Sequence, residues 1–333
     1  MRWRATREVH EIAGENERRR GDIASGMKFD TLVIVNPASG GGRALRAEPE
    51  VASLLASRGC RVKFVHSKSS GDIREQAARA ATEGFRIVVA LGGDGAFHHL
   101  VEGIRGTDVV AGFFPAGNGN DIARALGIPL DPVEAANSFS RGQPRAVDLV
   151  RVRFNDGSEA HYMGAGGMGL DAEAAHLANT RFRAWPGVTR YLAGAFTIFF
   201  REPLLDVTAE MDGANWSGRA LFVAVANATS YGSGVRIAPQ AEMDDGLLDV
   251  VIVGDVGLPR LLEAIPIVLT SGDLRGFPEV TRYRCRQVSL RADRPARVHG
   301  DGEELGVAPA EFEILPGAIR VMVGRKITTD EHR

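Results

Sequence analysis

Apolar runs that alternate with helical patterns organise the first half of the chain. Four runs rich in β-branched and other apolar residues are typical of strands buried on both faces, at 31–35 (TLVIV), 61–65, 86–91 (RIVVAL) and 109–114. Helical spacing follows each run, at 44–57, 71–83, 97–104 and 122–126. Asp72 is the expected N-cap of the second helix. Strands separated by single helices predict an α/β domain with a doubly wound, mainly parallel sheet.

The pattern changes near Arg145, where alternating apolar and polar positions begin to dominate. Alternation of this kind predicts a β-rich, antiparallel domain, with strands at 147–154, 204–211, 220–226, 247–253, 280–291, 311–315 and 319–323. Two helical stretches interrupt these strands, near 171–180 and 258–269. We therefore expect a charged extension over residues 1–27, a nucleotide-binding domain over 28–145 and a lipid-substrate domain over 146–310. The last strands, about 311–325, could pack back on the first domain.

Composition narrows the class of protein without naming a function. The 333 residues include 40 Lys and Arg against 42 Asp and Glu, so the net charge is close to neutral. A near-neutral protein has no overall attraction to nucleic acid, and we expect no nucleic-acid partner. Two cysteines, Cys60 and Cys285, are too few for a disulfide framework. The charged N-terminus has no apolar signal-peptide core, and the longest apolar stretch, 191–200, is too short to span a bilayer. These features predict a cytoplasmic protein.

Glycine is abundant, with 40 residues, and its clusters follow three of the predicted buried strands. The clusters are Asn36–Gly42, Gly92–Gly95 and Gly117–Asp121. Glycine permits the backbone conformations that turn successive amides toward one phosphate, and strand ends are where open α/β sheets bind ligands. Asp94 lies among these donors, and its carboxylate would repel phosphate unless a divalent cation lay between them. The pattern therefore predicts a phosphate site with Mg²⁺.

Several other motifs are absent or weak. The sequence contains no P-loop, no protein-kinase catalytic loop and no zinc-ligand spacing. The adjacent His98 and His99 would project in different directions from a helix, which disfavours a shared metal. A GxGxxG segment, Gly164–Gly169, lacks the strand ending in an acidic residue that a dinucleotide-binding unit requires, so we interpret it as a turn.

These motifs, in this order and spacing, resemble the catalytic family of diacylglycerol kinases, which includes related lipid kinases and sphingosine kinases. The resemblance covers about residues 28–325. It rests on six segments: Asn36-Pro37-Ala38-Ser39-Gly40, Gly92-Gly93-Asp94-Gly95, Pro115–Arg124, Val147-Asp148-Leu149, Asp244–Asp249 and Gly300-Asp301-Gly302-Glu303.

The resemblance implies an ATP-dependent lipid kinase that transfers the γ-phosphate to a hydroxyl of diacylglycerol or a related lipid, with Mg²⁺. Asp94 would work with Mg²⁺ and the phosphates, and Asp301 with Glu303 would form the general-base region. Arg124 and Asp148 would form a buried ionic pair. A second, structural Mg²⁺ would be held by Asp245 with Glu242 and Leu247. The implied nucleotide contacts are Asn36, Pro37, Ala38, Ser39, Gly40, Ser67, Gly92, Gly93, Asp94, Gly95, Ala96, Phe97, His98, Asn118, Asn120 and Asp121.

The chain departs from the family pattern at several of these positions. Ala96 stands where a threonine is usual, His98-His99 replaces an Asn-Glu pair, and Asn118 replaces another threonine. Gly41 stands where a lysine is usual, with Arg43 nearby as a substitute. Two alternatives stay open: another kinase with a GGDG element, such as an NAD kinase, and a catalytically impaired protein that binds lipid or nucleotide.

The implied substrate sets the expected partners and location. A lipid kinase meets its substrate at the membrane surface, so we expect transient, peripheral membrane contact of a cytoplasmic protein. A homodimer stays open. The sequence does not indicate which lipid is the acceptor. The apolar stretch 191–200 could contribute to a hydrophobic slot in the second domain or the cleft.

Overall fold

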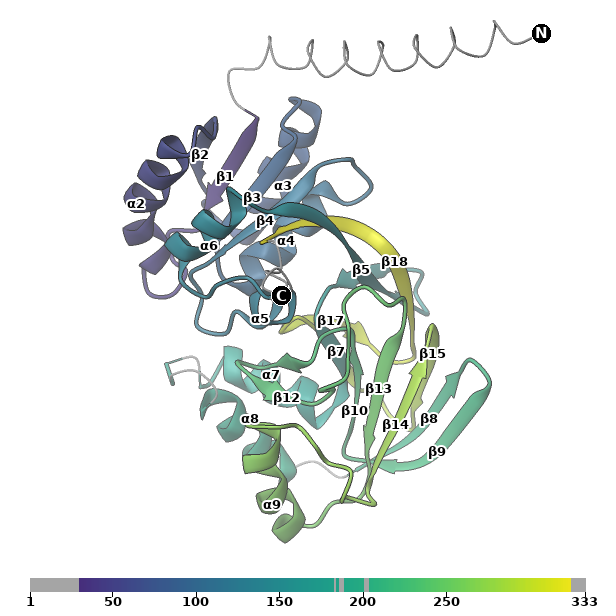
Figure 1. Ribbon diagram of the computed structural model, residues 1–333. Helices are drawn as coiled ribbons and strands as arrows, with labels where there is room; N and C mark the ends of the chain where they lie inside the picture. Colours follow the sequence, from purple (N-terminus) through teal and green to yellow (C-terminus); the bar gives the residue numbers. More distant parts are fainter. Residues whose placement is uncertain (1–29, 183, 186–188, 201–203, 325–333) are drawn as a thin grey trace, which may run out of the picture.

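The computed structural model describes residues 30–182, 184–185, 189–200 and 204–324. Figure 1 shows an α/β half and a β-rich half, with the last described strand returning to the first half. The predicted fold class is confirmed. The expected extension over residues 1–27 lies outside the described residues.

The first half is built on four parallel strands in the order β2-β1-β3-β4. These strands are β1 (Thr31–Val35), β2 (Val62–His66), β3 (Ile87–Gly92) and β4 (Val110–Pro115). Every residue of β1 and β4 is buried, as their continuous apolar runs require. The helices are α2 (Arg43–Ser57), α3 (Ser70–Thr82), α4 (Asp94–Ile104), α5 (Asp121–Leu126) and α6 (Pro132–Phe139). Helix α2 packs beside α6, and α3 packs beside α4.

The β-rich half contains two sheets that enclose a second core. One sheet has the antiparallel order β14-β13-β10-β7-β16-β17. Its strands are β7 (Ala165–Gly169), β10 (Phe222–Ala226), β13 (Leu248–Val253), β14 (Val280–Cys285), β16 (Arg297–Gly300) and β17 (Glu303–Val307). The other sheet is continuous with the first half, because β18 (Ala310–Val323) runs parallel to β4 at Arg320–Val110.

Five further strands extend this sheet from β18: β15, β8 and β9 follow one another in that order, and β5 pairs with both β18 and β6. They are β5 (Gln143–Phe154), β6 (Glu159–Tyr162), β8 (Leu205–Met211), β9 (Ala214–Ala220) and β15 (Gln287–Ala292). Strand β5 pairs antiparallel to β18 over most of its length. The remaining elements are the short hairpin β11 (Ser230–Tyr231) and β12 (Val235–Arg236), and the helices α7 (Leu170–Asn179), α8 (Thr189–Phe199) and α9 (Leu258–Val268).

The structure corrects several element predictions. Ser69, not Asp72, caps α3: its hydroxyl accepts from the Asp72 backbone N–H. Helix α4 begins three residues before the expected Phe97, and the predicted strand over 280–291 divides at Arg286 into β14 and β15. The two strands expected at 311–315 and 319–323 are one strand with a register shift. Helix α6 and strand β9 were not predicted.

The GxGxxG segment forms strand β7 instead of the expected turn. Strand β7 lies between β10 and β16, and its glycines allow very close backbone packing. A Cβ on Gly167 would lie 2.1 Å from the Val223 carbonyl oxygen, so only glycine fits. The glycines of this segment therefore serve sheet packing.

Candidate active site

The three Gly-rich turns of the first half touch one another at the carboxyl ends of β1, β3 and β4. The Gly93 backbone N–H donates to the Ser39 hydroxyl at 3.2 Å. A Cβ on Gly117 would lie 2.6 Å from the Gly93 Cα, and one on Gly40 would lie 2.1 Å from the Ala116 carbonyl oxygen. The absence of side chains at these positions is what lets the turns meet.

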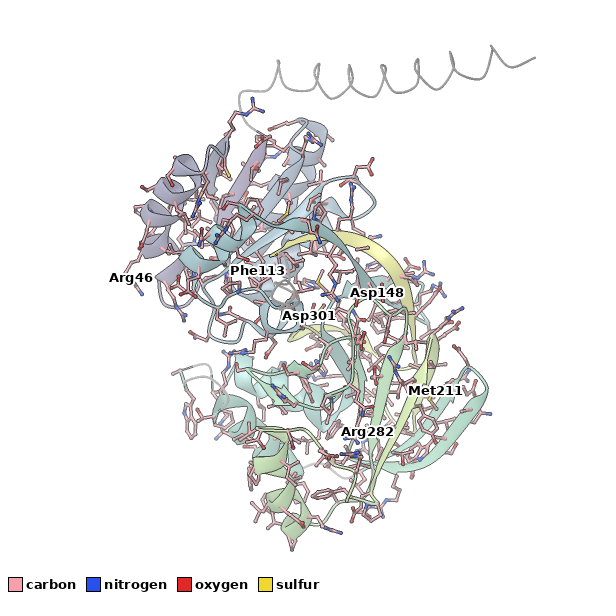
Figure 2. All side chains as sticks on the ribbon, in the orientation of Figure 1. Arg46, Phe113, Asp148, Met211, Arg282 and Asp301 are labelled. Carbon is pink, nitrogen blue, oxygen red and sulfur yellow. The ribbon has the colours of Figure 1, made fainter. Side chains whose placement is uncertain are left out.

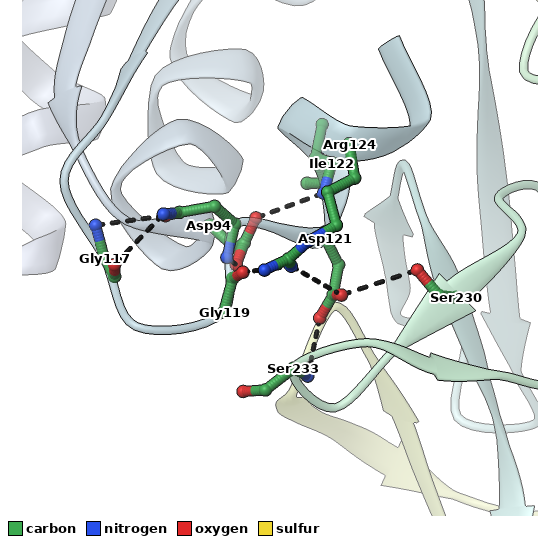
Figure 3. Close-up of polar contacts among 9 residues, drawn as sticks. Asp94, Gly117, Gly119, Asp121, Ile122, Arg124, Ser230 and Ser233 are labelled. Atoms are coloured by element: carbon green, nitrogen blue, oxygen red, sulfur yellow. Dashed lines mark hydrogen bonds and ion pairs between the residues drawn. The ribbon is translucent and has the colours of Figure 1, made fainter. Parts of the chain in front are cut away.

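Asp94 joins the second turn to the third (Figure 3). Its carboxylate accepts from the backbone N–H groups of Asn120 at 2.6 Å and Ile122 at 3.2 Å. Asn120 itself adopts a left-handed backbone conformation and bonds Gly117 through both its side-chain oxygen and its side-chain nitrogen. Burial, followed by the negative charges of Asp121 and Asp301, raises the pKa of Asp94 to about 6.

Asp121 connects the third turn to the β-rich half. Its carboxylate accepts from the Ser233 backbone N–H at 2.7 Å and from the Ser230 hydroxyl at 3.5 Å (Figure 3). The same carboxylate pairs with Arg124 at 3.3 Å. Burial raises the pKa of Asp121 despite these partners.

The predicted ionic pair between Arg124 and Asp148 is wrong. Arg124 contacts Asp121 and the Gly119 carbonyl oxygen, both within its own turn. Asp148 is buried on β5 and accepts from the backbone N–H groups of Gly246 at 2.8 Å and Gly317 at 2.7 Å. A backbone donor thus occupies each oxygen of the Asp148 carboxylate, so this buried group is satisfied without Arg124.

Asp301 anchors the turn between β16 and β17. Figure 2 shows it where the two halves of the molecule meet. Its carboxylate accepts from the backbone N–H groups of Met163 at 2.8 Å, Gly164 at 2.8 Å and Ala165 at 3.3 Å. Two residues on, Glu303 is exposed, and in the described part of the chain no hydrogen bond or ion pair occupies its carboxylate. A Cβ on Gly95 would lie 3.6 Å from the Glu303 Oε1 atom, so Glu303 faces the N-terminus of α4.

These groups line one cavity of about 250 Å³ between the two halves. From the first half come Asp94, Asp121 and the glycines of the second and third turns, and from the β-rich half come Asp301, Glu303 and Arg190. Sequence reasoning missed Arg190, His299 and the segment 230–233. The last could have been found from its letters, SYGSG, which form a Gly-rich turn after a buried strand.

Two family models match the chain: the diacylglycerol kinase catalytic domain over residues 30–152, and the YegS C-terminal NAD kinase beta sandwich-like domain over residues 164–323. A diacylglycerol kinase of Mycobacterium tuberculosis is 31% identical over 292 residues, covering 87% of this chain and 93% of that protein. The chain belongs to the diacylglycerol kinase family.

Other relatives agree with this assignment. A probable YegS-like lipid kinase of Stenotrophomonas maltophilia is 27% identical over 300 residues, covering 87% of this chain and 94% of that protein. The crystal structure of a putative diacylglycerol kinase from Bacillus anthracis superposes with a TM-score of 0.73 at 22% identity, covering 90% of this chain and 99% of that one, and shows the same fold. In the part of this family member that the structure describes, no helix has the length and apolar character needed to cross a bilayer.

The residues that family resemblance assigns to nucleotide binding divide into two groups. Gly93, Asp94, Gly95, Asn118 and Asp121 line the cavity. The others do not line it, and among them Ser67 is buried and donates to the Val35 carbonyl oxygen at 3.2 Å, while Phe97 stacks on Phe113 in the core. Arg43, the expected lysine substitute, donates to the Asn118 side chain at 3.4 Å, which places a cation at the third turn.

The second predicted Mg²⁺ site holds an ion pair in this family member. One Asp245 oxygen accepts from the Leu247 backbone N–H at 3.0 Å, and the other contacts Arg284. No cluster of three or more histidine, cysteine or acidic side chains suited to a metal occurs among the described residues. A cation held by Asp245 with the carbonyls of Glu242 and Leu247 stays a prediction, and it would have to displace Arg284.

A second, apolar cavity of about 150 Å³ adjoins the first. Helix α8 contributes Leu192 and Phe196, and α9 contributes Leu261 and Ile265. Tyr231 and Gly232 line both cavities. A polar, carboxylate-lined space and a space suited to hydrocarbon thus lie beside the same short hairpin.

Proposed function

We propose that this chain transfers the γ-phosphate of ATP to a hydroxyl of diacylglycerol or a related lipid, with Mg²⁺ as the cation. The observation that carries the proposal is that a polar and an apolar cavity share Tyr231 and Gly232 in their walls. A lipid with its hydroxyl in the polar cavity and its chains in the apolar one would place polar and apolar parts in matching surroundings.

The Gly-rich turns suit a polyphosphate. Gly93, Gly95 and Gly117 expose backbone at the cavity wall, and α4 directs its N-terminus there. The carboxylates of Asp94, Asp121 and Glu303 would repel the phosphates in the absence of a cation. Mg²⁺ is commonly held by one or two carboxylates together with substrate phosphates, so this donor set fits it. Bound there, Mg²⁺ would offset the negative charge of the transferring group.

The Asp301–Glu303 turn would accept the proton of the lipid hydroxyl. Three backbone donors already occupy Asp301, whereas among the described residues no hydrogen bond or ion pair occupies the Glu303 carboxylate. We therefore assign proton acceptance to Glu303 and the anchoring of the turn to Asp301. This division of roles refines the general-base region that family resemblance gave to both residues.

The apolar cavity is the proposed acyl site. Four of the large apolar side chains that are exposed lie on or beside α7, α8 and α9: Trp185, Phe200, Leu262 and Leu269. Amphipathic helices with apolar residues toward the bilayer bind membranes reversibly. Brief membrane contact of a cytoplasmic protein at these helices would give the cavity access to its lipid.

The acceptor decides the proposal. Purified full-length chain is supplied with labelled ATP and Mg²⁺ and offered, separately, diacylglycerol, monoacylglycerol, sphingosine and NAD. We expect label in one of the lipids. Label in NAD alone would select the NAD kinase alternative, and label in none of the acceptors from folded protein would favour the non-catalytic alternative.

A further inference from the structure

Helix α4 contacts the β-rich half through two histidine–carboxylate pairs. The Nδ1 atom of His98 on α4 lies 3.6 Å from the Oδ2 atom of Asp301, and these side chains are only 10% and 2% exposed. One helical turn further on, the Oε1 atom of Glu102 lies 3.5 Å from the Nδ1 atom of His161 on β6. Helix α4 supplies the histidine of the first pair and the carboxylate of the second.

The two pairs form a single charged row. His98 and Glu102 are four residues apart and therefore lie on the same face of α4. The row runs Asp301, His98, Glu102, His161, so that each imidazole lies beside at least one carboxylate. An unpaired buried charge is strongly destabilising, and the alternation of imidazoles and carboxylates in this row gives each buried group a partner.

The surroundings shift the pKa values of the two histidines in opposite directions. Burial works against protonation of His98, but the hydrogen bond and charge of Asp301, with Glu102 and Glu303, outweigh it and raise the pKa of His98. Burial lowers the pKa of His161, and the opposing effects of Glu102 and Glu159 against Arg105 and Arg151 do not reverse this. His98 thus lies between two carboxylates that favour its protonation, while burial disfavours protonation of His161 beside Glu102.

We propose that His98 is a positioning residue: its side chain holds the Asp301 carboxylate, and with it the turn that carries Glu303, against α4 of the nucleotide-binding half. The Glu102–His161 pair fastens the same helix one turn away. The proposal rests on the phosphotransfer function proposed above, in which Glu303 must face the Gly95 turn.

The position of Glu303 depends on this contact for a geometric reason. Asp301 holds its own sheet through Met163, Gly164 and Ala165, and within the described residues His98 is its side-chain partner from α4. Asp301 also adopts a left-handed backbone conformation, which a non-glycine residue keeps only where its contacts enforce it. Loss of a proton from His98 would therefore weaken the contact with Asp301 that helps to set the distance between Glu303 and the phosphate site.

The first test detects the contact between His98 and Asp301 without measuring catalysis. The histidines of the full-length chain are labelled with ¹³C and titrated by NMR, and the His98 signal is assigned from His98→Asn. We expect His98 to titrate above 6.5, and its midpoint to fall in both Asp301→Asn and Glu102→Gln. Either substitution alone suffices for the reading if the other prevents folding. A midpoint at or below 6.5, or one that neither substitution moves, overturns the pair.

The second test measures the effect of the His98–Asp301 contact on catalysis. We expect kcat/KM for lipid phosphorylation by the wild-type chain to fall as the pH rises through the His98 midpoint. His98→Asn should lose this alkaline limb and be about 10- to 100-fold slower below it, because small displacements of reacting groups have effects of this size. His99→Asn is the matched control: burial lowers the pKa of His99 to about 4, so it stays neutral throughout and its replacement should keep the limb.

Each failure has its own signature. A wild-type chain that labels no lipid contradicts the proposed function, while the NMR titration still judges the His98–Asp301 pair. An active His98→Asn enzyme that retains the wild-type limb contradicts the positioning role and leaves the kinase function intact.

Discussion

The Asp121 carboxylate accepts a hydrogen bond from the backbone N–H of Ser233, at 2.7 Å, and so ties the third Gly-rich turn to the hairpin shared by both cavities (Figure 3). Asp121→Ala removes this acceptor. We expect a loss of about 1–3 kcal/mol in the free energy of unfolding, because the substitution leaves a partly buried donor unpaired. Urea denaturation measures the loss. Asp156→Ala, which removes only local bonds to Ser158 in an exposed turn, should be nearly neutral, and equal losses in the two variants would contradict the role of Asp121.

Glu303→Gln separates proton acceptance from binding. The amide keeps the size of the side chain but cannot take a proton, so we expect kcat to fall by about 10²–10⁴ with little change in Tm. Glu304→Gln is the matched control, because the neighbouring carboxylate is exposed and pairs with Arg297 and His176. Unaltered kcat in Glu303→Gln would return the general base to Asp301.

Asp94 makes the stability of the chain depend on pH. Its pKa is about 6 in the folded chain against 3.8 in the reference state, so the native state binds more protons between these values. The stabilisation from protonated Asp94 is complete below about pH 4 and is lost as the pH rises through 6. Wild type should therefore exceed Asp94→Ala in Tm by more at pH 4.5 than at pH 7. An equal Tm difference at both pH values would show that the folded-state pKa is not raised.

Gly117→Ala tests the close approach of the turns. The new Cβ would lie 2.6 Å from the Gly93 Cα, and backbone on both sides must move to accept it. We expect destabilisation of more than about 1 kcal/mol, the range of overpacking, and a raised KM for ATP. Gly276→Ala meets no atom within 4 Å and needs no unusual backbone conformation, so Tm and KM should be unchanged. Matching effects in both variants would argue against a packed turn.

The acyl site is tested by filling it. Ala264 of α9 faces the apolar cavity, and Ala264→Trp would occupy much of its 150 Å³. We expect KM to rise for long-chain diacylglycerol and to stay nearly constant for a short-chain analogue and for ATP. Leu130→Trp, at an exposed position just before α6 that lines neither cavity, controls for the added indole. A parallel rise in KM for both chain lengths would place the acyl chains elsewhere.

Local patterns predicted much of this fold. Strand β1 was predicted at its observed bounds, because a short apolar run buried on both faces depends little on its neighbours. The division at Arg286 was not predictable, since alternation continues through the turn between β14 and β15. Strand β7 was missed because its glycines are needed for close packing against β10 and β16, and both of these strands lie far away in the sequence.

The site divides in the same way. The Gly-rich turns and Asp94 were found because their chemistry is local to the ends of consecutive strands. The partners of Arg124 and Asp148 were mistaken, because a buried carboxylate can be satisfied by backbone donors that no side-chain pattern reveals. The contact between His98 and Asp301 joins residues about 200 positions apart, and nothing in either segment alone indicates it.

The most direct measurement is the transfer itself. Full-length chain is incubated with γ-³²P-labelled ATP and dioleoylglycerol in mixed micelles, with Mg²⁺ or with EDTA, and the lipids are extracted and separated. Label should appear in a phosphorylated lipid only with Mg²⁺, and Glu303→Gln should reduce it strongly. Folded wild-type protein that labels neither this lipid nor any other in the acceptor panel, or equal labelling with EDTA, would contradict a Mg²⁺-dependent lipid kinase.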